Sequence, residues 1–265
     1  MKKDVLSQDY IKTLLWGSVF DVCVVEETAS TNTLVREKAE LGAKEGLVII
    51  GKKQTGGRGR MGRKFCSPKD SGLYMSLLLR PSFSPSETLY ITAAAAVSVC
   101  RALEKFTDKK MGIKWVNDIY FGGKKLCGIL TEASFSAGGD NLNYAVLGIG
   151  INIYAPKGGF DPEIANIAGA VFKEDEALEN LKNKIAASIL SEFWNIYTET
   201  DRRATICEYK ERSILYGEKV DVIRANDVKS ATVLSIDDDL KLKVIYDDGQ
   251  IDRLYSGEVS IKKQS

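Results

Sequence analysis

The chain has 265 residues, 44% of them hydrophobic, which is enough for one large domain with or without a small appendage. Its 37 basic residues nearly balance its 36 acidic ones, and a net charge of +1 excludes the bulk positive field that favours nucleic acid. The absence of histidine excludes Ser-His and Cys-His catalysis, and five cysteines without a Cys-x-x-Cys pair indicate reduced thiols.

The N-terminal region predicts a strand, a helix and then two strands. Residues 11–20 are too short and too polar for a signal peptide or a transmembrane segment, so we expect a soluble cytoplasmic protein. Alternation predicts a strand over 18–26, and helical spacing predicts a helix over 31–41. Apolar runs bounded by glycine predict strands over 46–53 and 72–80.

A glycine-arginine run separates these last two strands. Residues 56–63 read Gly-Gly-Arg-Gly-Arg-Met-Gly-Arg. Glycines let a backbone approach a ligand closely, and arginines present fixed charged forks to phosphate or carboxylate oxygens. The run therefore predicts a loop that binds a small anion. A segment that binds single-stranded nucleic acid is the alternative, but such tracts repeat and this one occurs once.

The middle of the chain mixes strands and helices. Ser84 is the predicted N-cap of a helix that runs to about residue 105. Two short strands over 113–115 and 119–121 precede a longer strand over 125–133, and another is predicted over 143–152. An amphipathic helix is expected over 176–199, and Asp201 caps one that reaches about residue 212.

The last fifty residues alternate as five short strands, predicted over 219–224, 230–236, 241–246, 250–255 and 259–262, with polar turns between them. They indicate a small SH3-like β-barrel. Strands mixed with helices, without regular βαβ alternation, predict an α+β fold for the rest. We place the catalytic domain at residues 1–212 and the SH3-like domain at 213–265.

Three motifs agree in order and spacing with one known family. They are the glycine-arginine loop, Lys-Trp-Val-Asn-Asp at 114–118 and Lys-Lys-Leu-Cys-Gly-Ile-Leu at 124–130, and the chain strongly resembles the biotin protein ligases. Ser-Thr-Asn at 30–32 and Gly-Ile-Gly-Ile-Asn at 148–152 are similar to two further family motifs. The resemblance covers about residues 18–262. It implies a mixed or antiparallel sheet with helices, related to class II aminoacyl-tRNA synthetases, and the SH3-like module.

Two positions depart from the family pattern. Val116 replaces the usual proline, and Phe65 replaces a tryptophan but keeps an aromatic face. Members that also repress transcription carry an N-terminal helix-turn-helix domain. About 18 residues precede the first predicted strand here, so we expect a monofunctional ligase that does not bind DNA.

The resemblance implies a ligase with ATP and biotin as substrates, which forms biotinyl-AMP and transfers biotin to a lysine of a biotin carboxyl carrier protein. Bringing a carboxylate up to a triphosphate requires cations. Arg58, assisted by Gly57, is expected to bridge the biotin carboxylate and the α-phosphate. Lys125 is expected to neutralise charge that develops during transfer, although a solvated hairpin lysine is the alternative. Arg60 and Arg63 are assigned to the outer phosphates.

The ureido head of biotin needs polar partners at the end of an apolar pocket. Ser30, Thr31 and Gln54 fit that need, with Asn32 in the same motif; a helix N-cap is the alternative for Ser30 or Thr31. Lys114, Trp115 and Gly128 are expected as pocket wall or backbone positioners, and Phe65 is expected to contact the ligand through its aromatic face. Without the motif, a tryptophan such as Trp115 would more often be interpreted as a core residue.

Asn117 and Asp118 form an ordinary turn dipeptide, but the motif assigns Asp118 to the attacking lysine amine. Asn152 is expected near phosphate or Mg²⁺, and Mg²⁺ to arrive mainly with the nucleotide, without a dedicated metal site on the protein. Lys262 is expected near ATP.

Two other functions stay open. A lipoate ligase or octanoyltransferase shares this fold, although those families associate a glycine-rich motif with histidine. A nucleic-acid or adaptor module belongs to a different class, and the near-zero net charge argues against it. No membrane partner is expected, and a homodimer is possible.

Overall fold

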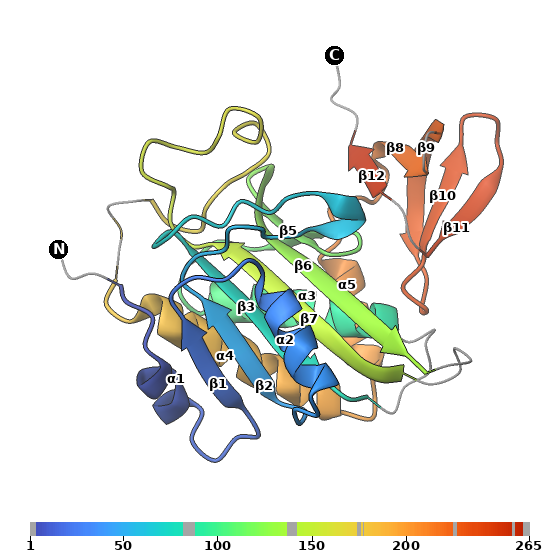
Figure 1. Ribbon diagram of the computed structural model, residues 1–265. Helices are drawn as coiled ribbons and strands as arrows, with labels where there is room; N and C mark the ends of the chain where they lie inside the picture. Colours follow the sequence, from blue (N-terminus) through green and yellow to red (C-terminus); the bar gives the residue numbers. More distant parts are fainter. Residues whose placement is uncertain are drawn as a thin grey trace.

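Two sheets organise the chain, and the structure, a computed structural model, describes residues 4–81, 88–136, 142–173, 176, 178–224, 227–255 and 258–261. A seven-stranded mixed sheet carries the helices, and a five-stranded antiparallel sheet stands beside one end of it (Figure 1). This arrangement confirms the predicted α+β fold with a C-terminal β-module.

The seven-stranded sheet has the order β1-β2-β3-β7-β6-β5-β4. Only β1 and β2 pair in parallel, and the other neighbours are antiparallel. The strands are β1 Asp21–Val25, β2 Leu47–Gly51, β3 Gly72–Leu79, β4 Gly112–Lys114, β5 Asp118–Phe121, β6 Lys124–Phe135 and β7 Leu142–Asn152. Each predicted strand of this region is present, with its ends within a few residues of the prediction.

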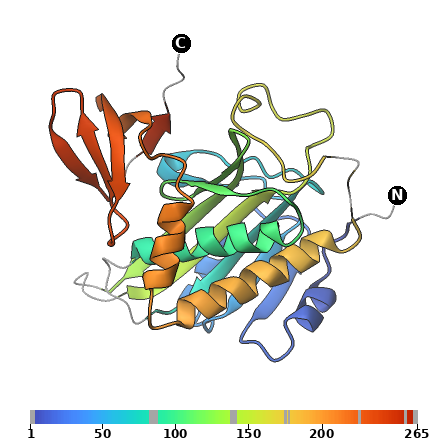
Figure 2. The same cartoon turned by 180° about the vertical axis from the view of Figure 1, so that it is seen from behind.

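Helices cover both faces of this sheet. α2 (Thr31–Glu40) packs on one face, against β2, β3 and β7 (Figure 1). The long helices α3 (Thr88–Glu104) and α4 (Leu181–Thr198) cross the other face, with α5 (Arg203–Glu211) beside α3 (Figure 2). Residues 93–96 of α3 are fully buried alanines, whose small side chains allow neighbouring elements to approach closely.

The second sheet has the order β11-β10-β9-β8-β12, so the last strand returns to pair with the first. Its strands are β8 Lys219–Arg224, β9 Asp227–Ile236, β10 Leu242–Tyr246, β11 Ile251–Leu254 and β12 Glu258–Ile261. Alternate residues such as Val220, Val222 and Val244 are buried, as the sequence pattern predicts. The indole Nε1 of Trp115 donates to Leu240 O at 2.9 Å and so ties this sheet to the larger unit.

The N-terminal segment accounts for two differences from the predicted elements. Helix α1 (Gln8–Leu14) was not predicted, and α4 begins at Leu181 rather than at residue 176. The carboxylate of Asp4 accepts from Lys182 N at 3.0 and 3.3 Å and satisfies a donor of the first turn of α4. A capping group 178 residues away in sequence leaves no local pattern. The predicted Ser84 cap lies outside the described residues.

None of the helices described here is long and apolar enough to span a membrane.

Candidate active site

A cavity of about 830 Å³ lies between the seven-stranded sheet, the glycine-arginine loop, the segment after β7 and β12. This volume is in the range of small-molecule sites. Fifteen of the residues that the sequence analysis assigned to the site line it: Ser30, Thr31, Asn32, Gln54, Arg58, Arg60, Arg63, Phe65, Lys114, Trp115, Asn117, Asp118, Lys125, Gly128 and Asn152.

Glycines of β6 and β7 line one side of the cavity, which we call its floor. Gly148 and Gly150 alternate along β7, so they face the same side of the sheet, and Gly128 of β6 lies opposite Gly150. A Cβ at Gly148 would stand 2.1 Å from the Asn32 Oδ1 atom, and one at Gly150 would stand 2.6 Å from the Phe65 ring. The spacing of the Gly-Ile-Gly motif therefore gives room to two site residues that come from other elements.

One end of the cavity is built around Gln54, and we call it the closed end because Thr31 and Asn32, which line it, are buried. Its Oε1 accepts from Thr31 N at 2.8 Å and from Thr31 Oγ1 at 3.1 Å, while its Nε2 donates to Ser67 Oγ at 2.9 Å. Ser30 holds the N-cap position of α2, but its side chain makes no capping hydrogen bond. Gln54 thus satisfies a first-turn donor of α2 and joins that helix to Ser67, which follows the glycine-arginine loop.

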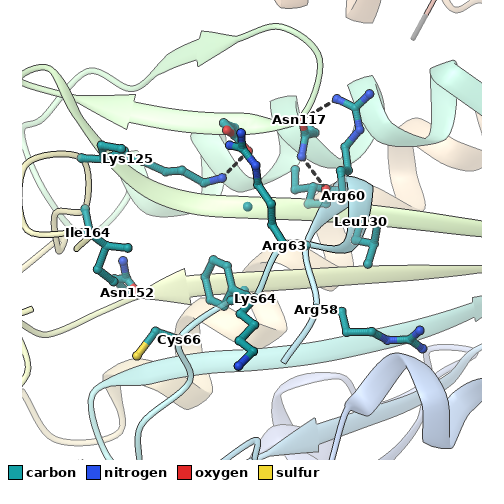
Figure 3. A pocket seen from close by; sticks show the side chains of 18 of the residues that line it. Arg58, Arg60, Arg63, Lys64, Cys66, Asn117, Lys125, Leu130, Asn152 and Ile164 are labelled. Carbon is teal, nitrogen blue, oxygen red and sulfur yellow. Dashed lines mark hydrogen bonds and ion pairs between the residues drawn. The ribbon is translucent and has the colours of Figure 1, made fainter. Parts of the chain in front are cut away.

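The opposite end is cationic. Arg60, Arg63 and Lys125 extend toward the Asn117 side of the cavity (Figure 3). Arg60 Nη1 donates to Asn117 Oδ1 at 3.0 Å, and Asn117 Nδ2 donates to Ile129 O at 2.8 Å, which fixes the Asn117 amide. Lys125 Nζ lies 2.7 Å from Asp118 Oδ1. Three positive charges meet here beside one carboxylate.

Arg58 does not join this cluster. Its side chain points away from the other cations (Figure 3), and its Nη2 donates to Thr33 Oγ1 at 2.9 Å and lies 3.8 Å from Glu132 Oε1. The expected convergence of Arg58 with Arg60 and Lys125 is therefore absent from this structure. Because Arg58 is exposed, these two contacts hold its side chain only weakly.

The glycine-arginine loop folds back on itself. Phe65 N donates to Gly57 O at 2.9 Å, Gly59 N donates to Arg63 O at 2.7 Å, and Met61 takes a left-handed conformation with φ of 54°. Gly57 is packed inside this turn, where a Cβ would stand 2.4 Å from Phe65 O. It does not line the cavity in this structure, and its expected role, to let backbone N–H groups reach the ligand oxygens, stays a prediction.

Trp115 lines the cavity and also belongs to the hydrophobic core, because only 4% of its surface is exposed. The next residue, Val116, follows a cis peptide bond, and its carbonyl accepts from Tyr209 OH at 2.9 Å. Burial raises the pKa of this Tyr209 hydroxyl well above its usual range, so it remains a proton donor.

One wall of the cavity, the segment after β7, was not predicted from the sequence. Pro156, Phe160, Ile164 and Ile167 are among its lining residues. It is pinned to the site by Lys125 N, which donates to Ile167 O at 2.8 Å, and by Asn152 Nδ2, which donates to Gly169 O at 2.9 Å. The segment has no periodic pattern, and its only signal in the sequence is its length after a glycine-rich strand.

The second sheet also reaches the cavity. Val259, Ser260 and Ile261 of β12 line it, while Lys262 lies outside the described residues. Among the side chains that the structure describes, no three acidic, cysteine or histidine groups cluster closely enough to hold a metal ion.

The sequence is similar to those of known proteins. Residues 24–152 match the Biotin/lipoate A/B protein ligase family. The chain is 40% identical over 140 residues to the Bifunctional ligase/repressor BirA of Bacillus subtilis, which covers 53% of this chain and 42% of that protein. It is 28% identical over 206 residues to the Biotin--[acetyl-CoA-carboxylase] ligase of Mycobacterium tuberculosis, covering 75% and 73%.

The fold has counterparts among solved structures. The biotin protein ligase of Aquifex aeolicus in complex with biotin and ATP superposes with a TM-score of 0.72 at 24% identity, over 92% of this chain and 99% of that one. This likeness shows that the two chains share a fold. The chain spans less than half the length of the first curated relatives that it matches.

Proposed function

We propose that the protein is a biotin protein ligase, on the basis that its residues 24–152 match the biotin/lipoate A/B protein ligase family. It joins biotin to ATP to form biotinyl-AMP and pyrophosphate, and then transfers biotin to a lysine of a biotin carboxyl carrier protein. The relatives named as ligases, and the solved ligase with biotin and ATP bound, support this proposal.

One observation carries the proposal: a single cavity has hydrogen-bonding groups at its closed end and cations at its other end. Biotin is polar at both ends and apolar between them. Its carboxylate and a triphosphate repel each other by about 4 kcal/mol per unit pair at a surface-like dielectric, so an enzyme that joins them must supply positive charge. Arg60, Arg63 and Lys125 stand where that charge is needed.

In the first half-reaction, a biotin carboxylate oxygen attacks the α-phosphorus of ATP, and the bond from that phosphorus to the pyrophosphate oxygen breaks. Lys125 stabilises the negative charge that develops on the transferring group. Arg60 and Arg63 hold the leaving pyrophosphate. Arg58 leaves Thr33 and Glu132 to bridge the biotin carboxylate and the α-phosphate. Mg²⁺ travels with the nucleotide, and no step here depends on a protein site for it.

In the second half-reaction, the acceptor lysine amine attacks the acyl carbon of biotinyl-AMP, and AMP leaves. The incoming ammonium must first lose a proton, and the chain contains no histidine to take it. The carboxylate of Asp118 lines the cavity and lies 2.7 Å from Lys125 Nζ. We assign Asp118 to orienting the amine and accepting its proton.

The C-terminal sheet completes the site in this proposal. β12 lines the cavity, and the Trp115 to Leu240 hydrogen bond ties its sheet to the cavity wall. We therefore keep residues 213–265 as an SH3-like domain that works together with the catalytic domain at 1–212, and we keep Asn152 and Lys262 as contacts for the nucleotide.

The test is pyrophosphate release by the purified protein with ATP and one candidate acid at a time: biotin, lipoate or octanoate. We expect release with biotin alone, and labelling of an added biotin carboxyl carrier domain at one lysine. Release with lipoate but not biotin would assign the protein to the lipoate branch, and release with none of the acids would overturn ligase activity.

A further inference from the structure

Glu132 lies on β6, outside the cavity lining, yet its carboxylate contacts two residues of the site. Glu132 Oε2 accepts from Asn32 Nδ2 at 2.7 Å. Glu132 Oε1 lies 3.8 Å from Arg58 Nη2. Neither contact joins neighbours in sequence, and together they connect β6, α2 and the glycine-arginine loop. The glutamate carries no catalytic assignment in the proposed reaction, so the arrangement calls for another explanation.

The Asn32 amide is held on both sides. Its Oδ1 lies 2.6 Å from the fully buried Ser76 Oγ, and its Nδ2 faces Glu132 and, at 3.4 Å, Leu130 O. An amide could turn over and exchange its oxygen and nitrogen, but a carboxylate offers only acceptors. Glu132 therefore forces Nδ2 toward itself and Oδ1 toward Ser76.

This orientation determines the hydrogen bonds of the closed end. Three oxygen–oxygen contacts follow one another: Asn32 Oδ1 to Ser76 Oγ at 2.6 Å, Ser76 Oγ to Thr31 Oγ1 at 2.7 Å, and Thr31 Oγ1 to Gln54 Oε1 at 3.1 Å. Only the two hydroxyl groups bring protons to these contacts. This row of four oxygen atoms therefore has three contacts but only two protons to share among them. A ligand N–H group that reaches Thr31 Oγ1 or Gln54 Oε1 can donate to an oxygen that lacks a proton from within the row.

We propose that Glu132 is a positioning residue: its carboxylate fixes the Asn32 amide and thereby keeps the closed end of the cavity rich in acceptors for a ligand that carries N–H donors. The inference rests on the proposed function, in which those donors are the ureido N–H groups of biotin. If the Asn32 amide turned over, its Nδ2 would face Ser76 Oγ and bring a third proton to the three contacts. The row of oxygen atoms would then no longer favour an N–H group of a ligand.

Three variants test the proposal by steady-state pyrophosphate release. Glu132→Ala removes the carboxylate that fixes the Asn32 amide. Glu132→Gln offers Asn32 either an oxygen or an NH₂ group. Glu37→Gln removes one negative charge from an exposed position on α2 and serves as the control. We expect Glu132→Ala to raise the biotin KM about ten- to a hundredfold, as for loss of a charge-assisted hydrogen bond, with kcat and the ATP KM little changed. Glu132→Gln should give a smaller rise in the biotin KM.

The kinetic pattern separates this role from two others. A biotin KM equal to wild type in Glu132→Ala overturns the proposal, even if the melting temperature falls, because the residue is then merely structural. Equal changes of the ATP KM in both Glu132 variants, with the biotin KM unchanged, also overturn it and assign Glu132 to the Arg58 contact alone.

A measurement without substrate tests the role of Glu132 independently of whether the proposed function is correct. With ¹⁵N-asparagine labelling, the Asn32 side-chain amide is assigned by its loss in Asn32→Asp, and its exchange with solvent is measured by NMR. We expect exchange at least about tenfold faster in Glu132→Ala, as for loss of a charge-assisted hydrogen bond, and unchanged in Glu37→Gln. Unchanged exchange in Glu132→Ala overturns the proposal. If the wild type activates an acid other than biotin, the proposed function fails, and the same KM comparison is made with that acid.

Discussion

The ammonium of Lys125 and the carboxylate of Asp118 lie 2.7 Å apart at the cationic end of the cavity, where their side chains are 28% and 19% exposed. Each charge compensates the other across this contact. The proposed reaction nevertheless uses them in different steps, because Lys125 acts on the phosphorus and Asp118 acts on the incoming amine. Substitutions of the two partners should therefore impair different half-reactions.

Lys125→Ala is expected to slow biotinyl-AMP formation by about 10²–10³-fold with little change in biotin affinity, because the ammonium acts where charge develops in the transition state. The lost pairing should lower the free energy of unfolding by about 1–3 kcal/mol. Single-turnover pyrophosphate release measures the first effect. Asp118→Asn is the contrast: it should still form the adenylate but transfer biotin slowly. Wild-type adenylation by Lys125→Ala would remove this lysine from the reaction.

Arg58→Gly should convert the protein into one that loses its intermediate. Without the proposed clamp, biotinyl-AMP binding should weaken by about ten- to a hundredfold, the cost of a charge-assisted hydrogen bond. Lys125 still supports slow adenylation, so an unrelated lysine-rich protein added to the reaction should become labelled. Arg203→Ala, which removes an exposed arginine outside the cavity, should not cause this labelling. Continued adenylate synthesis without stray labelling would show that Arg58 does not retain the intermediate.

Cys66 provides a chemical probe of the cavity. Cys66 and Cys207 are both exposed, but only Cys66 lines the cavity. Cys100 and Cys127 are buried, and burial raises the pKa of both thiols, to about 12 for Cys100, so they should not react in the native state. We expect biotin and ATP together to slow alkylation of Cys66 and to leave Cys207 unaffected, as measured by mass spectrometry of peptides. Equal rates at Cys66 with and without ligands would place the bound ligands elsewhere.

Acid should weaken the junction of α3 and α5. Burial opposes ionisation of Glu104, but hydrogen bonds from Arg212, at 2.7 and 3.0 Å, and from Met111 N outweigh it and lower the pKa of this carboxyl. A lowered folded-state pKa gives stability that is fully present above the unfolded value of about 4.3 and is lost as the pH falls through the folded one.

The check is urea unfolding of wild type and Glu104→Gln between pH 7 and pH 3.5. At pH 7 the variant should be less stable by about 1–3 kcal/mol, and the difference should shrink below about pH 4.3. A difference that stays constant with pH would contradict this assignment.

Features that repeat along the chain were predictable from the sequence. The alternation of β8 gave its bounds, and the apolar strands 46–53 and 143–152 correspond to β2 and β7. Motifs that combine unusual residue types in a short run, such as the glycine-arginine loop, predicted fifteen of the residues that line the cavity. Local information was sufficient wherever the determining contacts lie within a few residues of one another.

What the sequence did not reveal depends on contacts between distant residues. Asp4 reaches Lys182, and Glu132 reaches Asn32, through the tertiary fold alone. Glu132 stands in a strand pattern, where a charged residue ordinarily indicates a solvated position. The direction of Arg58 also depends on which acceptors the fold brings near its loop, and no motif specifies that.

The floor of the cavity has an evolutionary consequence, because two of its glycines tolerate substitution unequally. An alanine at position 150 would press on the Phe65 ring, which belongs to a loop and can settle elsewhere. An alanine at position 148 would press on Asn32, which Ser76 and Glu132 hold from both sides. A substitution at position 150 could be accommodated by a movement of the Phe65 ring alone. Drift at position 148 would require several positions to change together, so that site should be the slower of the two to vary.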